Sequence, residues 1–586
     1  MRHTLSAIFS FALLLLSGIS PAPAAPPAIP PHPPHPEPPP QPAMPKLIIT
    51  ILVDQLRYDY LERWRDHFVD GGFKLLLDRG AFMTYAHYNY MPTTTAPGHA
   101  SAFSGTTPAS HGIIGNDWFD KRTRKVINCV DDPTVLSVGA PGTGGKHSPR
   151  NFIGNNFADE LRLRYQSKVV GISMKDRGAV LPAGKKPTGA FWFEGKTGNF
   201  ITSTYYMSEL PAWVVAFNKK QRAHSFLGQT WDRLLPAKDY DYADKLPGES
   251  GLPGEKVAIF PHLIAKVDPK AAEDDDVATD LESALNPLVQ TDKPQGLFDL
   301  FFPSPFANQF LAEFAEAAIE GEQLGTGPGP DLLTVSFSAI DACGHRFGPY
   351  SQEVEDITLR LDRQLAEFFK VVDKKVGLAN VAIMLTADHG VMPQPDFAAL
   401  QGFDGRRANT TLLVGDLLAK LGERFGSGNV LLAKNIYDGN VYFNYDYLRE
   451  KNIAPAEVAS FIRDWALATG RFQACYSREQ ILDGRAPGPL GQRVINGFNA
   501  ERSGDVVLVY KPYTIPWGVV GGTTHGSGYS YDTHIPILFY GSLFKPGRYP
   551  DDVSITDIIP TLCTALRMTE PAGCIGKPII PVLANP

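Results

Sequence analysis

Residues 46–54 read KLIITILVD, an unbroken run of apolar and β-branched side chains that ends in an aspartate. Such a run is typical of a strand buried on both faces of a parallel sheet. The same design recurs in residues 331–341 (DLLTVSFSAID) and 380–388 (NVAIMLTAD). Open α/β folds bind their ligands at the carboxyl ends of parallel strands. We therefore expect three buried strands that bring Asp54, Asp341 and Asp388 to one edge of one sheet.

The segment between the last two of these strands, residues 353–376, has the spacing of an amphipathic helix. Its apolar residues follow one another at intervals of three or four positions: Val354, Ile357, Leu361, Leu365, Phe368 and Val372. Strand, helix and strand then form a βαβ unit. Further strands are predicted at residues 505–510 and 534–540, and a closing helix at residues 555–566. The predicted fold class is α/β, with a mostly parallel central sheet flanked by helices.

Two stretches depart from this core pattern. Residues from about 178 to 300 are rich in Gly, Pro and aromatic side chains, and residues from about 396 to 500 carry mixed short elements. We expect both to be insertions that wall the carboxyl edge of the sheet.

The composition is that of a folded protein without affinity for nucleic-acid polymers. Hydrophobic residues make up 43% of the 586 residues, which is enough for a large core. The 55 lysines and arginines are outnumbered by 62 aspartates and glutamates, so the net charge is -7. A protein that binds DNA or RNA through its phosphates needs an excess of basic residues, and this chain has none.

The first 45 residues look like a targeting segment followed by a linker. Two basic residues precede an apolar run at residues 5–16, and small residues follow up to residue 25, which is typical of a secretory signal peptide. This run is shorter than the ~20 residues that a membrane-spanning helix needs. Residues 26–45 are dominated by proline and predict an extended tether. Residues 46–586 are then the folded domain of a periplasmic or secreted protein.

The cysteines do not form a metal-binding or redox motif. Their spacing shows no C-x-x-C pair, and five are too few for a disulfide scaffold: Cys129, Cys343, Cys475, Cys563 and Cys574. Outside the cytoplasm one or two disulfides are plausible, and Cys563 with Cys574 is the easiest pair by separation.

Carboxylates and imidazoles recur at the predicted strand ends. Asp341 and His345 are four residues apart, so one turn of helix or a tight loop can point both at one metal ion. Asp388 and His389 are adjacent at the next strand end, and His525 lies in a remote Gly-rich segment. Together with Asp54, these oxygen and nitrogen donors suit zinc.

A further segment, residues 91–101 (MPTTTAPGHAS), is a loop that leads into a short apolar helix. A hydroxyl at a helix N-terminus is favoured as an alkoxide, because the helix dipole and the unpaired N–H groups stabilise negative charge there. A simple N-cap threonine explains the same loop equally well. Composition does not decide between Thr93, Thr94 and Thr95.

These segments, in their order along the chain, resemble the alkaline phosphatase superfamily, and within it the secreted bacterial alkaline phosphatases with a threonine nucleophile, the phosphate-irrepressible type. The resemblance covers nearly all of residues 46–586 and rests on six motifs: 95–101 (TAPGHAS), 111–116 (HGIIGN), 173–178 (SMKDRG), 341–345 (DACGH), 388–390 (DHG) and 524–527 (THGS).

The resemblance implies a site for two zinc ions and a covalent mechanism. One zinc ion would be held by Asp341, His345 and His525, and the second by Asp54, Thr95, Asp388 and His389. It also implies that Thr95 is the nucleophile, that phosphate monoesters are the substrates, and that a phosphothreonine is the intermediate. His534 is assigned a structural role, because it opens a predicted strand.

The same resemblance implies that Asn116, Lys175 and Arg177 bind the phosphoryl oxygens. Two cations suit a phosphomonoester dianion, whose additional negative charge must be neutralised. Sulfatases of the superfamily are disfavoured, because residues 95–99 (TAPGH) have neither the Cys or Ser nor the Arg of their motif. A phosphodiesterase or nucleotide pyrophosphatase is the alternative enzyme. A pseudoenzyme would lack a ligand or the nucleophile, and none is missing.

Overall fold

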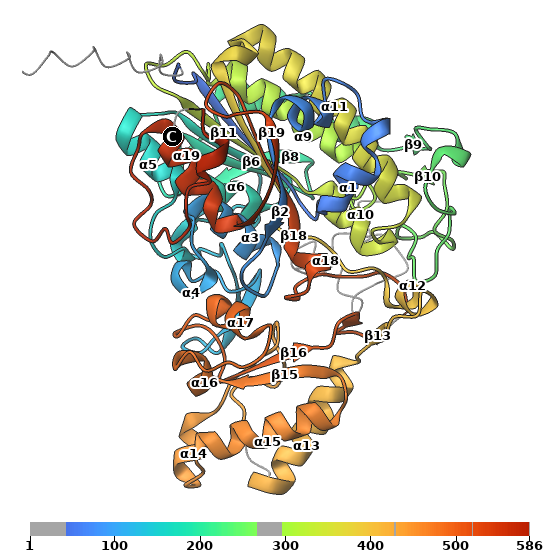
Figure 1. Ribbon diagram of the computed structural model, residues 1–586, viewed down its shortest axis with the longest axis vertical. Coiled ribbons are helices and arrows are strands. Elements are labelled where there is room, and N and C mark those ends of the chain that lie inside the picture. Colours follow the sequence, from blue (N-terminus) through green and yellow to red (C-terminus); the bar gives the residue numbers. More distant parts are fainter. Residues whose placement is uncertain (1–42, 266–295, 427–428, 519, 585–586) are drawn as a thin grey trace, which may run out of the picture. The chain divides into compact units, whose positions relative to one another are not determined.

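The computed structural model describes residues 43–265, 296–426, 429–518 and 520–584 of the chain (Figure 1). The predicted signal peptide and residues 26–42 of the predicted linker lie outside the described residues.

The central sheet has ten strands within the described part of the chain, and their order is β19-β2-β18-β12-β1-β11-β6-β7-β8-β5. Strand β1 (Leu47–Val53) lies between β11 (Asp331–Phe337) and β12 (Val381–Thr386) and is parallel to both. The first residue of β1, Leu47, is in register with the first residue of β11, Asp331. All seven residues of β1 are buried, as the unbroken apolar run predicts.

The sheet is mostly parallel, as predicted. Strands β11, β6 and β7 continue the parallel pairing on one side of β1, whereas β18 and β8 run antiparallel to their neighbours. The remaining bounds are β2 (Ala81–His87), β5 (Ser137–Val138), β6 (Val169–Ser173), β7 (Gly189–Glu194), β8 (Asn199–Ser203), β18 (His534–Tyr540) and β19 (Gly547–Ser554).

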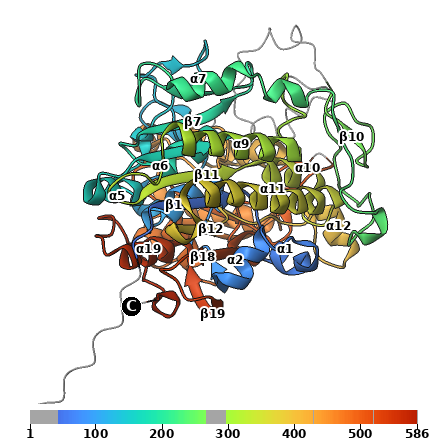
Figure 2. The same ribbon diagram turned by 90° about the horizontal axis from the view of Figure 1, so that it is seen from above.

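Helices cover both faces of the sheet. Figures 1 and 2 show the strands between one group of helices that contains α9, α10 and α11 and another that contains α3, α5, α6 and α19. The predicted crossover helix is α11, and the predicted closing helix becomes a 3-10 turn followed by α19. The bounds are α3 (Thr95–Ser104), α5 (Phe157–Tyr165), α6 (Asp176–Ala183), α9 (Pro305–Gly321), α10 (Ala339–Phe347), α11 (Gln352–Val376) and α19 (Ile558–Leu566).

The strand predicted at residues 331–340 is shorter than expected. It ends at Phe337, and α10 begins at Ala339, so Asp341 lies in the first turn of a helix and not at a strand end. Both the strand and the first turn of α10 are buried, so the apolar run continues past the end of the strand. The sequence therefore gives no sign of where the strand ends and the helix begins. Asp341 still lies at the carboxyl edge of the sheet, because α10 starts there.

The two predicted insertions differ from each other. The first begins inside the sheet, since β7 and β8 are strands of it, and only the segment after them leaves the sheet. Part of that segment, residues 266–295, lies outside the described residues. The predicted strand at residues 505–510 is β16 (Val506–Tyr510), which belongs not to the central sheet but to a second one with β14 (Asn440–Val441) and β15 (Phe472–Ser477).

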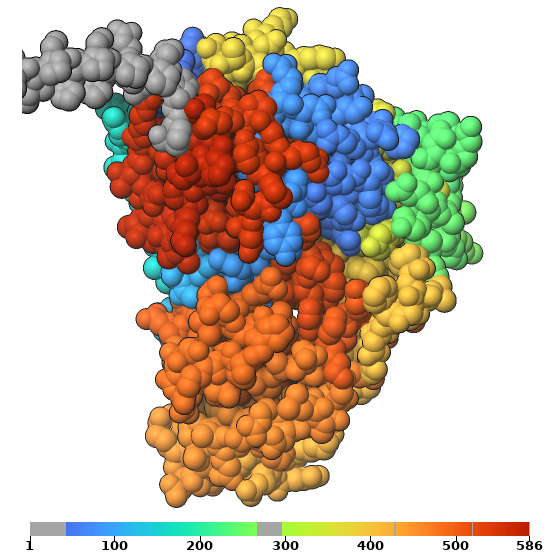
Figure 3. All heavy atoms as spheres, in the orientation of Figure 1, coloured from blue at the N-terminus to red at the C-terminus, as the bar shows by residue number. Residues whose placement is uncertain are grey.

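This second sheet gives residues 410–510 an apolar core of their own, which we call the insert domain. Buried side chains of α13 (Thr410–Phe425), α15 (Pro455–Ala468) and the three strands form that core. Figure 3 shows its atoms, in orange, as a continuous body. Side chains of the insert domain and of segments at the carboxyl edge of the central sheet line a common cavity.

Two further expectations concern the cysteines and the membrane. Cys563 and Cys574, the pair that is easiest by separation, are not joined by a disulfide in the structure. Among the described residues, no helix combines the length and the apolar character that crossing a bilayer requires.

Candidate active site

Three buried carboxylates meet at the carboxyl edge of the sheet. Asp54 directly follows β1, Asp388 follows β12, and Asp341 lies in α10, and each has an exposed fraction of 0%. Gln55 connects two of them: its backbone N–H donates to Asp388 Oδ1 at 3.2 Å and its side-chain amide donates to Asp341 Oδ1 at 2.6 Å. Gln55 cannot be recognised from the sequence, because a glutamine beside a strand-end aspartate has no distinguishing pattern.

Three histidines point their Nε2 atoms at these carboxylates. The Nε2 atoms of His345 and His525 lie 3.3 Å and 3.7 Å from Asp341 Oδ1, and His389 Nε2 lies 3.4 Å from Asp54 Oδ1. Each Nδ1 atom is 2.8 to 2.9 Å from a backbone carbonyl oxygen. When Nδ1–H donates to a carbonyl, the lone pair is on Nε2, so the rings are oriented as metal ligands.

The side chains form two overlapping groups of possible metal ligands. In each group the ligand atoms lie within 4.8 Å of one another, and His389 belongs to both: Asp341, His389 and His525, and Asp54, Asp388 and His389. The rings of His389 and His525 are stacked with centroids 3.5 Å apart. His345 is joined to the first group through Asp341. The structure thus brings together all six of the Asp and His residues that the sequence nominates.

The buried carboxylates at this edge of the sheet need cations nearby to neutralise their charge. Burial and the neighbouring Asp341 and Asp388 raise the pKa of Asp54 well above its usual value. Lys175 Nζ lies between two of the carboxylates, 2.8 Å from Asp54 Oδ2 and 2.7 Å from Asp341 Oδ2. Burial disfavours ionisation of Asp341 as well, but Lys175 and His345 outweigh it and hold the pKa of that carboxyl well below its usual value.

The donor set fits zinc. Imidazole nitrogens and carboxylate oxygens at one buried site are the ligands that zinc takes in catalytic centres. Asp54 Oδ1 is buried and accepts no hydrogen bond within the described part of the chain. Such an oxygen is costly unless a cation binds it.

Thr95 is the first residue of α3, and Thr94 is its N-cap. Thr95 Oγ1 lies 3.5 Å from His389 Nε2, whereas Thr93 Oγ1 donates to the carbonyl of Ser527 at 2.8 Å. The structure therefore brings Thr95 next to His389, a candidate metal ligand, whereas Thr93 is hydrogen-bonded to a loop. A hydroxyl at this position faces the positive end of the helix dipole.

Asn116, Lys175 and Arg177 are nearly buried around the same helix ends. Their exposed fractions are 6%, 6% and 2%. Asn116 Oδ1 accepts the backbone N–H of Ala96 at 2.8 Å, which fixes the amide beside the start of α3. Lys175 is the N-cap residue of α6, and its N–H donates to Ser173 Oγ at 3.0 Å.

Two supporting histidines were not found from the sequence. His99 is fully buried; its Nδ1 lies 2.9 Å from Thr95 O and 3.3 Å from Asp388 Oδ2, and its Nε2 lies 2.7 Å from Ser336 Oγ. His147 Nε2 lies 3.2 Å from Asp176 Oδ2, in the segment that carries Lys175 and Arg177. The position of His99 four residues after Thr95 on a helix was the available signal.

His534, in contrast, contacts Thr84 O and stacks on Tyr58, away from both ligand groups.

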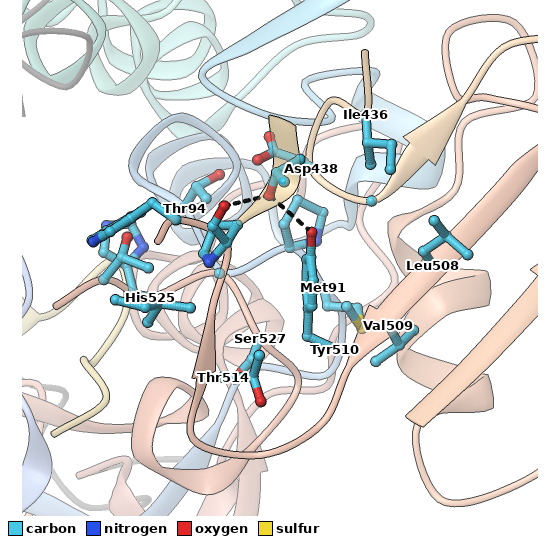
Figure 4. Close-up of a pocket in the computed structure, with 18 of the residues that line it drawn as sticks. Met91, Thr94, Ile436, Asp438, Leu508, Val509, Tyr510, Thr514, His525 and Ser527 are labelled. Atoms are coloured by element: carbon cyan, nitrogen blue, oxygen red, sulfur yellow. Dashed lines mark hydrogen bonds between the residues drawn. The ribbon is translucent and has the colours of Figure 1, made fainter. Parts of the chain in front are cut away.

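A cavity of about 500 Å³ opens beside these groups. Thr94, Asn116, His345 and His525 line one part of it, and residues of the insert domain line another (Figure 4). An α/β sheet whose carboxyl edge gathers carboxylates, imidazoles and a helix-terminal hydroxyl at such a cavity is the arrangement of a metal-dependent hydrolase.

Comparisons with known proteins agree with this class. The model of the family described as type I phosphodiesterase / nucleotide pyrophosphatase matches residues 48–526. The chain is 39% identical over 549 residues to alkaline phosphatase PafA of Elizabethkingia meningoseptica, covering 92% of this chain and 95% of that protein. It is 36% identical over 545 residues to alkaline phosphatase PhoV of Synechococcus elongatus, covering 92% and 93%.

The crystal structure of wild-type PafA superimposes with a TM-score of 0.83 at 38% identity, covering 92% of this chain and 99% of that one. Another solved structure is of a PafA variant in which a threonine, an asparagine, a lysine and an arginine are substituted. The chain therefore belongs to the type I phosphodiesterase / nucleotide pyrophosphatase family of the alkaline phosphatase superfamily.

Proposed function

We propose that this alkaline phosphatase hydrolyses phosphate monoesters through a phosphothreonine intermediate at Thr95, with two bound zinc ions as cofactors. The observation that carries the proposal is the position of Thr95, whose hydroxyl lies at the N-terminus of α3 and 3.5 Å from His389 Nε2. Asp341, His345 and His525 would hold one ion, and Asp54, Thr95, Asp388 and His389 the other. Bound zinc would act as a Lewis acid that lowers the pKa of the hydroxyl and stabilises the leaving oxygen.

The chemical steps themselves are carried out by side chains and backbone groups of the protein. Thr95 Oγ1 attacks phosphorus, the bond to the leaving alcohol breaks, and phosphate is carried by Thr95 until water hydrolyses it. The N-terminus of α3 stabilises negative charge at that oxygen. The PafA variant carries substitutions at a threonine, an asparagine, a lysine and an arginine. These are the residue types of Thr95, Asn116, Lys175 and Arg177.

Lys175, Arg177 and Asn116 would bind the non-bridging phosphoryl oxygens. A monoester brings two negative charges and a diester one, so cations beside the additional oxygen favour the monoester. This role is supported by the burial of Lys175 and Arg177 at the start of α6. Phosphodiesterase or nucleotide pyrophosphatase activity is the alternative, because the matching family model carries that description.

The test is the double variant Lys175→Ala/Arg177→Ala, assayed on an aryl phosphate and on its methyl diester. Charge-assisted hydrogen bonds contribute about 1.5–3 kcal/mol each, so kcat/KM for the monoester should fall by roughly 10²–10⁴, and that for the diester much less. Lys219→Ala/Lys220→Ala removes two exposed cations from α7 (Ala212–Lys219) and its C-cap, and serves as the control with the same change of charge. Equal proportional losses on both substrates would favour the diesterase.

The signal-peptide pattern of residues 1–25 supports a periplasmic or secreted location. Fractionation of cells that express the full chain, with N-terminal sequencing of the product, tests this part of the proposal.

A further inference from the structure

A second cavity lies beside the candidate active site, and its volume of about 530 Å³ is within the range of small-molecule sites. Its lining comes in part from α1 (Tyr58–Arg63), α12 (Pro395–Leu400) and α18 (Ser530–Thr533) (Figure 1). Of the described residues, Tyr531 alone lines both cavities, and no member of the two metal-ligand groups lines this one. We call it the tyrosine cavity, after the tyrosines in its lining: Tyr58, Tyr242, Tyr350, Tyr513 and Tyr531.

The aromatic rings of the tyrosine cavity pack on one another in two groups. In the first group, the ring centroid of Tyr350 lies 5.4 Å from that of Tyr242 and 5.2 Å from that of Phe397. In the second, the centroids of Phe403 and Tyr513 are 4.9 Å apart. The exposed fractions of Tyr242 and Phe403 are 36% and 53%, so both groups can be reached from solvent. Rings that are held by their neighbours and still accessible are preorganised to cover the face of a ring-shaped ligand.

The charged side chains that line the tyrosine cavity neutralise one another. Arg57 donates to both carboxylate oxygens of Asp59, at 2.7 Å from Nε and 3.2 Å from Nη2. The imidazole in the lining is His534, and burial lowers its pKa, so it is neutral at pH 7. Among the described residues of the lining, no cation is therefore left to pair with an anionic ligand.

A cationic ligand is also disfavoured, because arginines already contact the ring faces that it would use. The guanidinium carbons of Arg57 and Arg63 lie 5.4 Å and 5.0 Å from the ring centroid of Tyr350. Arg63 lies 5.5 Å from the ring centroid of Tyr242 as well. A quaternary ammonium ion binds in a cage of free aromatic faces, and here two guanidinium groups would repel it. The ligand that fits this lining is uncharged.

Polar groups of the lining distinguish between two kinds of uncharged ligand. The hydroxyls of Tyr350 and Tyr513 and the side-chain amide of Gln401 make no hydrogen bond to another residue of the described ranges. An entirely apolar ring would cover these groups without pairing them, which is unfavourable. A sugar ring has an apolar C–H face that can stack on aromatic side chains, and its hydroxyls can pair with the free polar groups.

We propose that the tyrosine cavity is a binding site for an uncharged saccharide. A sugar ring packs on the aromatic side chains, and its hydroxyls pair with Tyr350, Tyr513 and Gln401. The site is separate from the chemistry proposed at Thr95, because none of the proposed phosphoryl-binding residues lines it. The protein can then hold a glycan while its active site is free.

The class of ligand is tested by saturation-transfer NMR titrations of the zinc-loaded protein with three uncharged trisaccharides: maltotriose, cellotriose and triacetylchitotriose. At least one of them should bind with a Kd on the order of 1 mM or tighter. Indole, an apolar ring, and choline, a quaternary ammonium ion, should bind several times more weakly. Tighter binding of indole or choline than of every trisaccharide, or no binding of any trisaccharide, would overturn the proposal.

The place of binding is tested with Phe403→Ala, which should raise the Kd for the trisaccharide by about fivefold because it removes an aromatic face. Leu400→Ala is the matched control, since Leu400 ends α12, has an exposed fraction of 69% and does not line the cavity. Ile436→Ala changes the lining of the active-site cavity and should also leave the Kd unchanged. Weaker binding in Ile436→Ala but not in Phe403→Ala would place the saccharide in the active site and overturn the proposal.

The role of the hydroxyls is tested with Tyr513→Phe, which keeps the ring. The Kd for the trisaccharide should rise by about fivefold, the usual effect of one lost hydrogen bond. Tyr85→Phe is the control, because Tyr85 has an exposed fraction of 50% and lies outside the cavity. Hydrolysis of phenyl phosphate should be the same in Phe403→Ala, Tyr513→Phe and the wild type, which shows that the variants are folded. An unchanged Kd in both variants would overturn the proposal, whatever the outcome for the phosphatase activity.

Discussion

At the scale of single residues, the candidate metal ligands are contacted by neighbours that belong to neither ligand group. His99 contacts both the carbonyl of Thr95 and the carboxylate of Asp388, so it connects the proposed nucleophile with a proposed ligand. A group that orients a ligand raises metal affinity without touching the ion.

We expect His99→Ala to weaken zinc binding by about 10–100-fold, the usual effect of removing such a neighbour. The lost activity should return at high zinc concentration if His99 acts by positioning Asp388. His111→Ala is the control, because His111 is equally buried and its Nε2 contacts Ser101 Oγ of α3, but it touches no ligand. Zinc titration of both variants measures the difference; equal losses of zinc affinity in both would contradict this role for His99.

Several of the residues found from the sequence are polar side chains that directly follow a buried strand. Asp54, Asp388 and His389 follow apolar runs, so the pattern itself exposes them. Gln55 escaped notice because its role arises from contacts across the fold, over 286 positions for the Gln55–Asp341 hydrogen bond. No local pattern carries that information.

At the scale of elements, the antiparallel pair of β9 (Thr230–Trp231) and β10 (His262–Leu263) is attached to α11 through a buried histidine. His262 Nδ1 lies 3.0 Å from both carboxylate oxygens of Glu255, and its Nε2 lies 3.2 Å from Glu353 Oε1 at the start of α11. Burial lowers the pKa of this imidazole, but the hydrogen bonds to Glu255 and Glu353 outweigh it and raise the pKa from 6.5 to about 9.

This cluster makes stability depend on pH. Because the folded-state pKa is raised, the contribution is fully present below pH 6.5 and is lost as the pH rises through about 9. We expect the free energy of unfolding to fall by about 1–3 kcal/mol more in the wild type than in His262→Gln across this window.

Denaturant unfolding at several pH values and constant zinc measures this difference. His224→Gln is the control, since burial lowers the pKa of His224 and keeps it neutral over the same window. Parallel pH profiles for the wild type and His262→Gln would contradict the ion-paired cluster.

Elements whose apolar residues recur at a regular spacing were predicted well, and boundaries inside apolar runs were not. The helix expected at residues 353–376 is α11 (Gln352–Val376), because its apolar spacing is regular. The end of β11 was misplaced by three residues, because buried strand and buried helix share one composition.

At the scale of the whole molecule, the sheet concentrates negative charge from segments more than 300 residues apart at one buried edge. Cations must offset this charge. Chelation of the metal should therefore lower the thermal midpoint, and zinc should restore it after two equivalents per chain.

The size of the change in the thermal midpoint follows from the linkage between metal binding and folding. A ligand that binds only the folded state, at a thousand times its Kd, adds about 4 kcal/mol of stability. Magnesium at the same concentration should restore less, because it prefers oxygen to imidazole ligands. Calorimetry with and without chelator tests this; an unchanged midpoint in the chelated enzyme would contradict a metal-stabilised edge.

Strands β1, β11, β12 and β18 of the central sheet were predictable because each is an apolar run, whereas β19, which reads GRYPDDVS, offered no such signal. The insert domain was anticipated only as a departure from that pattern, because its short elements build their core from long-range contacts. The position of β7 and β8 in the central sheet was missed for the same reason.

In the proposed mechanism, Thr95 carries the phosphoryl group during turnover. The most direct measurement is to mix the zinc-loaded enzyme with excess aryl phosphate, quench it in acid within a single turnover, and locate the phosphate by peptide mass spectrometry. We expect a phosphothreonine at Thr95 that is lost in Thr95→Ala. Phosphate trapped on any other side chain of the wild type would contradict it.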